Sequence, residues 1–211
     1  QACRHVADEI DLIMVDAEGT VYDGDQLLYA IVRDRLQLGE VKGVVGTLMT
    51  NLAFEHAVGK LGVPFARAAV GDRYVMEMLT ENGWLFGGEN SGHILCLDRH
   101  TTGDGIVSAL QVLSAMRTSG VDLKTLLSEL TLYPQRLINV PVSKGFAWKD
   151  NAAIASASRE VEASMAGQGR VLLRASGTEP LLRVMVEGQD AVRVTAAAET
   201  LAAAVRQACA A

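Results

Sequence analysis

Two polar runs, each set between apolar stretches, carry the side chains of this chain that could do chemistry. The first, Gly87-Gly88-Glu89-Asn90-Ser91-Gly92-His93, lies between Trp84-Leu85-Phe86 and Ile94-Leu95-Cys96-Leu97. Its carboxylate, amide, hydroxyl and imidazole can hydrogen-bond the hydroxyls of a sugar, and its glycines let a ligand approach the backbone. Ordinary hairpin turns attract the same residue types, so that alternative stays open.

The second run, Arg174-Ala175-Ser176-Gly177-Thr178-Glu179-Pro180, offers a guanidinium, two hydroxyls and the amides around a glycine. A guanidinium matches a phosphate with paired hydrogen bonds, and the amides of a tight turn can form a nest that holds an anion. Three arginines, Arg170, Arg174 and Arg183, against the single Glu179 give a local charge of +2 (three minus one), whereas the whole chain carries −6. We therefore predict an anion site, and the two runs together indicate a sugar phosphate.

Composition restricts the class of protein. With 211 residues, 49% of them hydrophobic, the chain can bury a sizeable core. Its acidic balance argues against a nucleic-acid or anionic-membrane partner. The three cysteines are far apart and lack ligand spacing, which predicts reduced thiols in a cytoplasmic protein. No run of about 18 apolar residues or signal peptide is visible, and a first residue of Gln rather than Met suggests processing or a fragment.

Alternating strand and helix patterns in the first 130 residues predict a layered α/β domain with a mainly parallel sheet. The expected strands are 10–15, 20–22, 43–47, 65–70 and 94–97, and the expected helices are 26–38, 52–61, 71–80, 105–117 and 122–129. Ligands of such sheets collect at loops beyond the carboxyl ends of the strands, where the Gly87–His93 loop is expected. In helix 105–117, the apolar stripe that should face the core consists of Ile106, Ala109, Leu110, Leu113 and Met116.

The pattern resets around Tyr133-Pro134, so a domain boundary is expected near 130–135. A strand over 137–142, a helix over 149–165, two strands flanking the Arg174 run and an Ala-rich helix over 190–210 follow. Strands paired by a turn, with helices before and after them, predict a small α+β domain.

Five ordered runs make the chain resemble the phosphoglucosamine mutases, a bacterial branch of the α-D-phosphohexomutase superfamily. The runs are Asp23-Gly24-Asp25-Gln26, Val70 to Val75, Gly88 to His93, Thr101 to Ile106, and Arg174 to Arg183. The resemblance implies the C-terminal half of a four-domain enzyme. Residues 1–22 would be a remnant of domain two and a linker, 23–131 the sugar-binding domain three, and 132–211 the phosphate-binding domain four.

The resemblance also implies an activity, the interconversion of glucosamine 6-phosphate and glucosamine 1-phosphate through a bisphosphate, which feeds peptidoglycan precursors. A phosphoserine donates the phosphoryl group in that family, with Mg²⁺ beside it. By resemblance, the sugar contacts here are Glu89, Asn90 and Ser91, and His93 is the catalytic residue beside the reacting end. The implied phosphate contacts are Arg174, Ser176, Gly177, Thr178 and Arg183.

The chain departs from the family in its catalytic parts. The phosphoserine run, Thr/Ser-Ala-Ser-His-Asn-Pro, occurs nowhere, and Val6 to Asp11 stands where the metal loop Asp-Gly-Asp-x-Asp-Arg belongs. Because hard cations need several oxygen ligands, we assign no metal site and expect Asp8, Glu9 and Asp11 to be a solvated acidic run. Ala69 and Ala175 stand where relatives often carry lysine.

The fragment alone is therefore expected to be inactive, and to need N-terminal domains one and two for catalysis. Three alternatives stay open: a non-catalytic sugar-phosphate-binding module, a degenerate paralogue, or another hexose-phosphate mutase. A homodimer also stays open. Arg73 fits a phosphate contact or an ion pair with Asp72 equally well, whereas Asp104, Asp23 and Asp25 are expected to be cap and turn residues.

Overall fold

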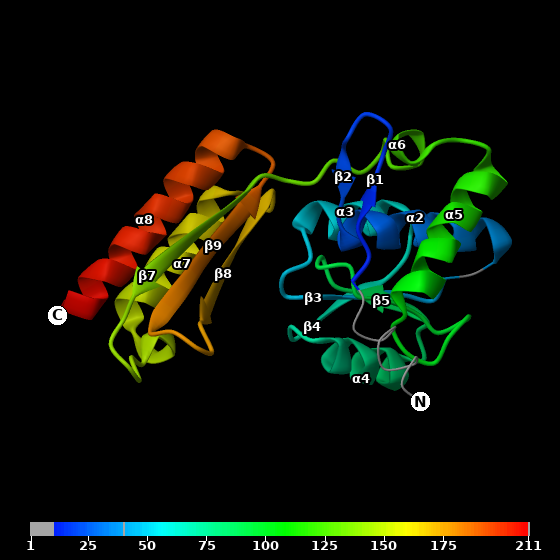
Figure 1. Ribbon diagram of the computed structural model, residues 1–211. Coiled ribbons are helices and arrows are strands. Elements are labelled where there is room, and N and C mark those ends of the chain that lie inside the picture. The colour runs from blue at the N-terminus through cyan, green and yellow to red at the C-terminus, as the bar shows by residue number, and fades with distance from the viewer. Residues whose placement is uncertain (1–10, 40, 211) are drawn as a thin grey trace. The chain divides into compact units, whose positions relative to one another are not determined.

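The computed structural model describes residues 11–39 and 41–210 of the chain. The chain divides into two compact units, residues 1–131 (unit 1) and residues 132–211 (unit 2) (Figure 1).

Unit 1 contains a four-stranded sheet in the order β4-β3-β5-β6. Its strands are β3 (Val44–Thr47), β4 (Phe65–Ala68), β5 (Phe86–Gly88) and β6 (Ile94–Cys96). Strand β3 runs parallel to β4 and β5, and only β6 pairs antiparallel, with β5. Every residue of β3 is buried, as a strand covered on both faces requires. The predicted layered α/β domain with a mainly parallel sheet is confirmed.

The helices of unit 1 are α2 (Gly24–Leu38), α3 (Leu52–Lys60), α4 (Asp72–Asn82), α5 (Gly105–Ser119) and α6 (Leu123–Leu126). Figure 1 shows α4 on one side of the sheet and α2 and α3 on the other, which gives three layers. Helix α2 begins at a capping box in which Asp23 accepts from the Gln26 amide and the Gln26 side chain accepts from the Asp23 amide. Helix α5 begins at Asp104, whose carboxylate accepts from the amides of Ile106 and Val107. Both caps agree with the sequence-based expectation.

The expected orientation of α5 is wrong. Its buried face consists of the small residues Gly105, Ser108, Val112 and Ala115. Three members of the predicted core-facing stripe are instead exposed, Ile106 by 60%, Leu110 by 57% and Leu113 by 48%. Small residues allow the helix backbone to lie close to its neighbours, while the larger apolar side chains project outward.

A two-stranded antiparallel hairpin, β1 (Met14–Val15) and β2 (Val21–Tyr22), precedes α2. The strand expected over 10–15 is shorter in the structure, and residue 10 lies outside the described part of the chain. The Asp16 carboxylate organises the turn by accepting from the amides of Glu18 (2.9 Å) and Thr20 (2.8 Å) and from the Tyr22 hydroxyl (2.9 Å). These hydrogen bonds hold the Asp16 pKa below its usual value, the Thr20 amide having the largest effect.

Unit 2 is an antiparallel sheet in the order β7-β9-β8 with two long helices. Its elements are β7 (Gln135–Pro141), the 3-10 helix η1 (Trp148–Asp150), α7 (Ala152–Ser164), β8 (Gly169–Ala175), β9 (Leu181–Gly188) and α8 (Ala191–Ala210). The apolar positions predicted for the last helix, Val194, Ala198, Leu201 and Val205, are all buried in one core with the sheet. The predicted α+β class is confirmed. Helix α7 begins at residue 152 instead of 149 because Asn151 caps it.

Candidate functional site

The first polar run forms the connection between β5 and β6, beyond the carboxyl end of β5, where a ligand loop was expected. Gly87 and Gly88 belong to β5, so they are strand residues and only Glu89 to His93 forms the turn. The Glu89 amide donates to the His93 carbonyl at 2.9 Å and closes the hairpin. The run therefore has the geometry of a hairpin turn. Its polar side chains lie at the edge of the sheet where parallel α/β folds ordinarily bind ligands.

Neighbouring backbone fixes this turn from two sides. The Gly24 amide, at the start of α2, donates to the Asn90 carbonyl (3.1 Å), and the Leu12 amide donates to the Gly92 carbonyl (3.0 Å). A Cβ at Gly24 would lie 2.1 Å from the Glu89 carbonyl oxygen, so only glycine permits this approach. Since the backbone is held and the Asn90 and Ser91 side chains are exposed, both are free to meet a ligand.

The side chain of Glu89 links the turn to the amino end of α4. Its Oε1 accepts a hydrogen bond from the Gly71 amide at 3.0 Å. Gly71 is the N-cap of α4 and offers no side chain to cap the helix. A carboxylate at a helix N-terminus is favoured by the unpaired amides and the helix dipole. The contact brings together the Val70–Val75 run and the polar turn, two of the five runs noted in the sequence.

His93 is buried, with 9% of its surface exposed. Its Nδ1 lies 3.7 Å from Asp11 Oδ1, and its Nε2 lies 3.9 Å from Asp72 Oδ2. Both separations exceed hydrogen-bond length. Gly103 lies against the ring, since a Cβ there would fall 2.1 Å from Nε2. The Thr101–Ile106 run thus fixes the position of the imidazole.

A cavity of about 510 Å³ opens beside this histidine in unit 1. It is lined by Asp72, Arg73, Met76, Glu77, Thr80, Glu81, Leu95, Thr102 and Gly103. The Arg73 side chain is 72% exposed, lies 3.3 Å from Glu77 and covers the Tyr74 ring. Arg73 therefore pairs with Glu77 one helical turn away, and the expected side-chain pair with Asp72 is absent among the described contacts. A phosphate contact by Arg73 stays a prediction.

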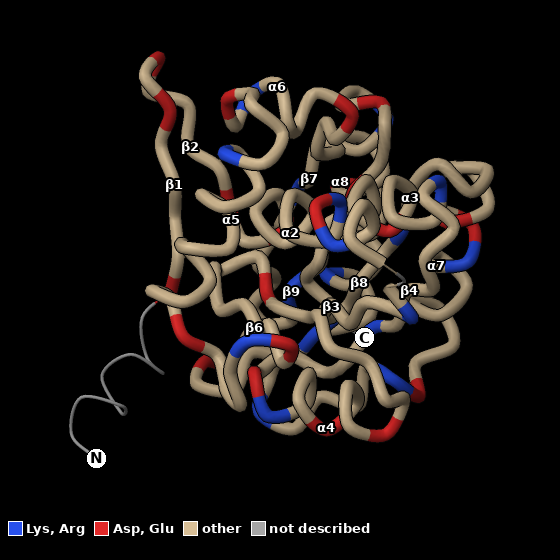
Figure 2. Tube along the Cα trace, turned by 90° about the vertical axis from the view of Figure 1, so that its right-hand side faces the viewer, with Lys and Arg blue, Asp and Glu red and all other residues tan. Residues whose placement is uncertain are grey.

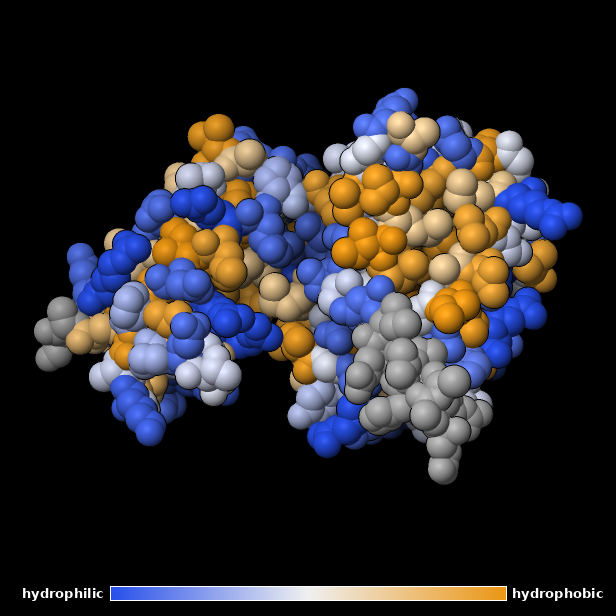
Figure 3. Space-filling view, in the orientation of Figure 1, coloured by the Kyte–Doolittle hydropathy of each residue, from blue (hydrophilic) through white to orange (hydrophobic). Residues whose placement is uncertain are grey.

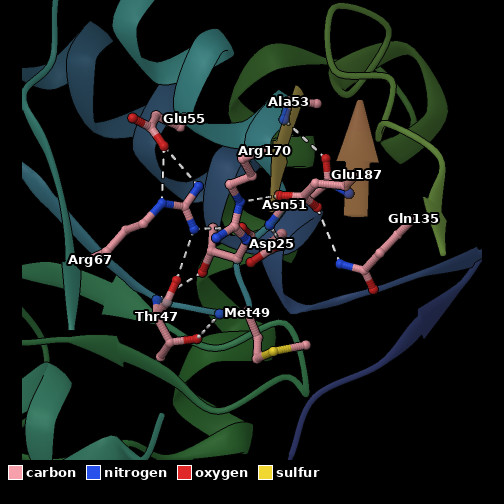
Figure 4. Close-up of polar contacts among 11 residues, drawn as sticks. Asp25, Thr47, Met49, Asn51, Ala53, Glu55, Arg67, Gln135, Arg170 and Glu187 are labelled. Atoms are coloured by element: carbon pink, nitrogen blue, oxygen red, sulfur yellow. Dashed lines mark hydrogen bonds and ion pairs between the residues drawn. The ribbon is translucent and has the colours of Figure 1, made fainter. Parts of the chain in front are cut away.

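A buried polar cluster beyond the carboxyl end of β3 was not predicted as a site (Figure 4). Asp25, expected to be a cap or turn residue, is 2% exposed and accepts from the Asn51 amide at 2.8 Å. Arg67 donates to Glu55 and to the Thr47 and Thr50 carbonyls. Polar residues directly after a buried strand were the available signal, since such loops border ligand sites in parallel sheets.

The second polar run forms the turn between β8 and β9 in unit 2. The strand register places Arg174 directly opposite Arg183, and Asn139 of β7 lies opposite Arg183 on the other side. Alternation along the strands puts Arg174 and Arg183 on the sheet face opposite the one that carries the core residues Leu173 and Leu182. Two arginines and an amide therefore form a row across one face of the sheet.

This row has two features that suit an anion. Directly opposed like charges destabilise a sheet unless a counter-charge lies between them. The Nε of Arg183 is buried and donates no hydrogen bond within the described part of the chain, and an unsatisfied buried donor is costly. A phosphate that accepted hydrogen bonds from the row would remove both penalties.

The local charge estimated from the sequence needs a correction. The carboxylate paired with Arg170 is Glu187, which also accepts from Gln135 at 3.2 Å (Figure 4). With Glu179 and Glu187 both counted, the charge of the region is +1 (three minus two) rather than +2. The excess of positive charge therefore rests on Arg174 and Arg183.

The turn itself presents donors. The Glu179 amide donates to Ser176 Oγ (3.3 Å) and the Ser176 amide to the Leu181 carbonyl (2.9 Å). Across the described residues, no acceptor is assigned to the amides of Gly177 and Thr178. No residue of the turn has a positive φ, so the left-handed form of an anion nest is not present. The two amides can still point at an anion from a simple turn.

A cavity of about 470 Å³ lies beside this turn. It is lined by Val142, Ser143, Lys144, Gly145, Phe146, Trp148 and residues 175–182. Arg174 and Arg183 are not among its lining residues, because their side chains project from the other face of the sheet. Lys144, which the sequence did not single out, supplies the cavity with a cation.

Metal ligands do not assemble within the described ranges 11–39 and 41–210, where no group of three or more His, Cys, Asp or Glu side chains could hold an ion. Asp8 and Glu9 of the acidic run lie outside those ranges. A magnesium ion therefore does not fit the residues described. A search of the same ranges for a helix both long and apolar enough to cross a membrane finds none.

Comparison with known families identifies two consecutive domains. A profile described as phosphoglucomutase/phosphomannomutase, alpha/beta/alpha domain III, matches residues 23–133. A second profile, described as the C-terminal domain of phosphoglucomutase/phosphomannomutase, matches residues 137–204.

Comparison with curated proteins finds long, close matches. The chain is 73% identical over 196 residues to a phosphoglucosamine mutase of Dechloromonas aromatica, and 60% identical over 201 residues to one of Thiobacillus denitrificans. These matches cover 93% and 95% of this chain but only 44% of each relative. The chain therefore spans less than half the length of the curated relatives it matches.

Solved structures agree on the fold. The N-acetylphosphoglucosamine mutase of Aspergillus fumigatus, crystallised with GlcNAc-6P and magnesium, matches with a TM-score of 0.76 at 21% identity, covering 94% of this chain and 50% of that one. A phosphoglucomutase/phosphomannomutase family protein of Burkholderia thailandensis matches with a TM-score of 0.72 at 17% identity, covering 96% and 45%. At these identities the likeness concerns the fold alone.

Proposed function

Because this chain belongs to the phosphoglucomutase/phosphomannomutase family, we propose that it serves as the C-terminal part of a phosphoglucosamine mutase. The activity of the whole protein is then the interconversion of glucosamine 6-phosphate and glucosamine 1-phosphate in the cytoplasm. One observation carries the proposal, the 73% identity to a phosphoglucosamine mutase across 93% of the chain. We further propose that residues 1–22 continue from a preceding domain, with 23–131 binding sugar and 132–211 binding phosphate.

In this proposal the β5–β6 turn binds the sugar. Glu89 accepts from a hydroxyl or amine of the ring while its Oε1 stays bonded to the Gly71 amide. Asn90 and Ser91, exposed on a turn whose backbone is fixed, complete the hydrogen bonds to the ring. An amino sugar suits the carboxylate, because an ammonium donor gives a charge-assisted hydrogen bond.

His93 is the proposed catalytic residue, acting on a proton at the reacting end of the sugar. Two carboxylates, of Asp11 and Asp72, lie within 4 Å of its ring nitrogens. Contact with Gly103 holds the ring in one place. A general acid or base must be positioned in this way before its proton is useful.

The β8–β9 turn binds the phosphate that is not transferred. Arg174 and Arg183 supply the positive charge, and Ser176, Gly177 and Thr178 supply hydroxyl and amide donors. A phosphorylated hexosamine offers its sugar ring to the β5–β6 turn and its phosphate to the β8–β9 turn. The phosphoryl donor and the Mg²⁺ that assists it belong to the portion of the relatives outside the match.

The test uses a full-length chimaera in which this chain replaces the matched C-terminal part of the Dechloromonas aromatica relative. We expect the chimaera to interconvert the two glucosamine phosphates and the 211-residue chain alone to be inactive. His93→Ala should lower kcat by about 10²- to 10⁴-fold, the range that general acid–base catalysis contributes. Arg174→Ala should weaken phosphate binding roughly tenfold or more, since a hydrogen bond to a charged group is worth about 1.5–3 kcal/mol. Lys144→Ala, which removes a cation from the other side of the β8–β9 turn, is the matched control.

An inactive chimaera, with the parent enzyme active and the chimaera folded, would contradict the proposed activity. If the isolated chain still bound glucosamine 6-phosphate, that result would favour the alternative of a non-catalytic sugar-phosphate-binding module. Faster turnover of a neutral hexose phosphate would instead assign another mutase of the family.

A further inference from the structure

A buried charged cluster around Arg35 takes no part in either polar turn. Arg35 lies in the last turn of α2 and is 8% exposed. Its Nε donates to Asp98 at 2.8 Å, its Nη1 to Asp34 at 2.7 Å and its Nη2 to Gln111 at 2.6 Å. Because the guanidinium is a rigid planar fork, three simultaneous hydrogen bonds hold these partners in one geometry.

Two of these partners lie on the elements that flank one loop. Asp98 follows β6, Gln111 belongs to α5, and residues 97–104 join the strand to the helix. Arg35 therefore bridges the segment that enters the loop and the helix that leaves it. Arg99 also lies 3.3 Å from Asp98, but its side chain is 52% exposed, and surface ion pairs contribute little. The buried bridge through Arg35 thus constrains both sides of the loop.

The same loop holds the His93 ring. Gly103 belongs to the loop, and a Cβ there would lie 2.1 Å from the imidazole Nε2. Ser108 of α5, 1% exposed, donates to the carbonyl of Ile94 at 3.1 Å, and Ile94 directly follows His93 in the chain. Helix α5 is thus attached to β6 at both ends of the strand, by Ser108 beside His93 and by Arg35 at the far end. A shift of α5 relative to β6 would move Gly103 relative to the imidazole.

The cluster lies between helices rather than at the surface. Figures 1 and 2 both show α2 beside α5, and the Asp34 and Arg35 side chains are 5% and 8% exposed. Figure 3 shows mostly hydrophobic residues on the outer surface over α5, whereas the charges of this cluster are buried. Buried ion pairs are screened little by salt, so the bridge persists under ordinary solution conditions.

We infer that Arg35 is a positioning residue for His93, because it fixes α5 against β6 and so keeps Gly103 against the imidazole. The inference rests on the proposed catalytic role of His93. A displacement of about 1 Å that arises far from the reacting atoms can lower a rate by about a hundredfold. The sugar-binding turn is held from elsewhere, by backbone hydrogen bonds from Gly24 and Leu12. Loss of the bridge should therefore act on kcat rather than on KM.

The test compares Arg35→Met with Arg33→Met in the full-length chimaera and in the isolated chain. Arg33 is the matched control, because it lies on the same helix but donates to the Leu126 carbonyl of α6 at 2.7 Å. In the chimaera, Arg35→Met should lower kcat by roughly tenfold to a hundredfold with KM near the wild-type value, whereas Arg33→Met should change neither. In the isolated chain, the NMR signal of the His93 Cε1 proton should shift in Arg35→Met and stay in place in Arg33→Met.

A second variant guards against misfolding. Removing Arg35 leaves the Asp34 and Asp98 carboxylates without their buried partner, which is strongly destabilising, so circular dichroism is recorded for each variant. If Arg35→Met is unfolded, Gln111→Met replaces it, because that change breaks the α5 side of the bridge and leaves both ion pairs in place. Gln111→Met should shift the same His93 signal and lower kcat.

A folded Arg35→Met or Gln111→Met protein with the wild-type His93 signal would overturn the inference. So would a shifted signal together with a wild-type kcat in an active chimaera, or an equal loss of kcat in Arg35→Met and Arg33→Met. The NMR signal is read in the isolated chain without turnover. An inactive wild-type chimaera would therefore count against the proposed function, while the His93 signal would still decide whether Arg35 positions the ring.

Discussion

The row of arginines across unit 2 makes one substitution especially informative. Arg183→Met keeps the aliphatic stem of the side chain and removes the guanidinium that lies opposite Arg174. If the row is a phosphate site, the substitution should have opposite effects on folding and on binding. The folded chain without ligand should become more stable, while its affinity for glucosamine 6-phosphate should fall.

The magnitudes follow from the register and from burial. Relief of a directly opposed like-charge pair is worth about 0.2–1 kcal/mol. Unit 2 has 80 residues (132 to 211), and in a domain of that size each kcal/mol moves Tm by about 4–8 °C. The ligand-free Tm of unit 2 should therefore rise by roughly 1–8 °C. Losing hydrogen bonds to a charged group costs about 1.5–3 kcal/mol, which is a loss in affinity of roughly tenfold to a hundredfold.

Scanning calorimetry with and without glucosamine 6-phosphate measures both the ligand-free Tm and the stabilisation that the ligand adds. At a ligand concentration of 100 times the wild-type Kd, the wild type should gain about 2.7 kcal/mol, whereas a variant bound tenfold more weakly should gain about 1.4 kcal/mol. Arg136→Met is the matched control, because Arg136 belongs to the same sheet and its side chain is 53% exposed near Glu199 of α8. That variant should keep the wild-type response to ligand.

A lower ligand-free Tm for Arg183→Met, combined with an unchanged gain on adding ligand, would refute the reasoning. That outcome would make Arg183 a structural residue whose guanidinium stabilises the sheet. It would also remove the strongest structural support for placing the phosphate on this face of unit 2.

Two further predictions concern unit 1. Gly24→Ala should lower the free energy of unfolding by about 1–3 kcal/mol, as overpacking does, because its Cβ would lie 2.1 Å from the Glu89 carbonyl oxygen. Gly59→Ala, whose Cβ would have nothing within 4 Å, should raise the free energy of unfolding by about 0.5–1 kcal/mol. A urea titration that found Gly24→Ala more stable than Gly59→Ala would contradict the close approach of Gly24 to the β5–β6 turn. The Asp16 pKa is held below 3.8 mainly by the Thr20 amide, so the hairpin gains stability that is present above pH 3.8 and lost as the pH falls through the lowered value. In an NMR titration, the pH-dependent shift of the Thr20 amide signal should have its midpoint below pH 3.8 and should be absent in Asp16→Asn. A midpoint at or above pH 3.8 would show that the hydrogen bonds to the Asp16 carboxylate do not stabilise the turn.

The sequence by itself determined the kinds of elements and much of their extent. Helix α2 could be predicted because Asp23 and a periodic apolar stripe are both local signals. The buried stripe of α8, from Val194 to Val205, follows from helical spacing alone. The two polar runs also stood out without coordinates, since glycines and hydrogen-bonding side chains between apolar strands are visible in any sequence.

Only the tertiary structure decided which faces are covered and which distant residues meet. Periodicity marks a stripe on α5 but not what covers it, and the structure leaves Leu110 exposed while Ala115 is buried. The Glu89–Gly71 hydrogen bond spans 18 residues, and the opposition of Arg174 and Arg183 depends on strand register. Local propensity acts over a few residues, whereas register and packing are set by the best burial of the whole chain, so these contacts become visible only in the folded units.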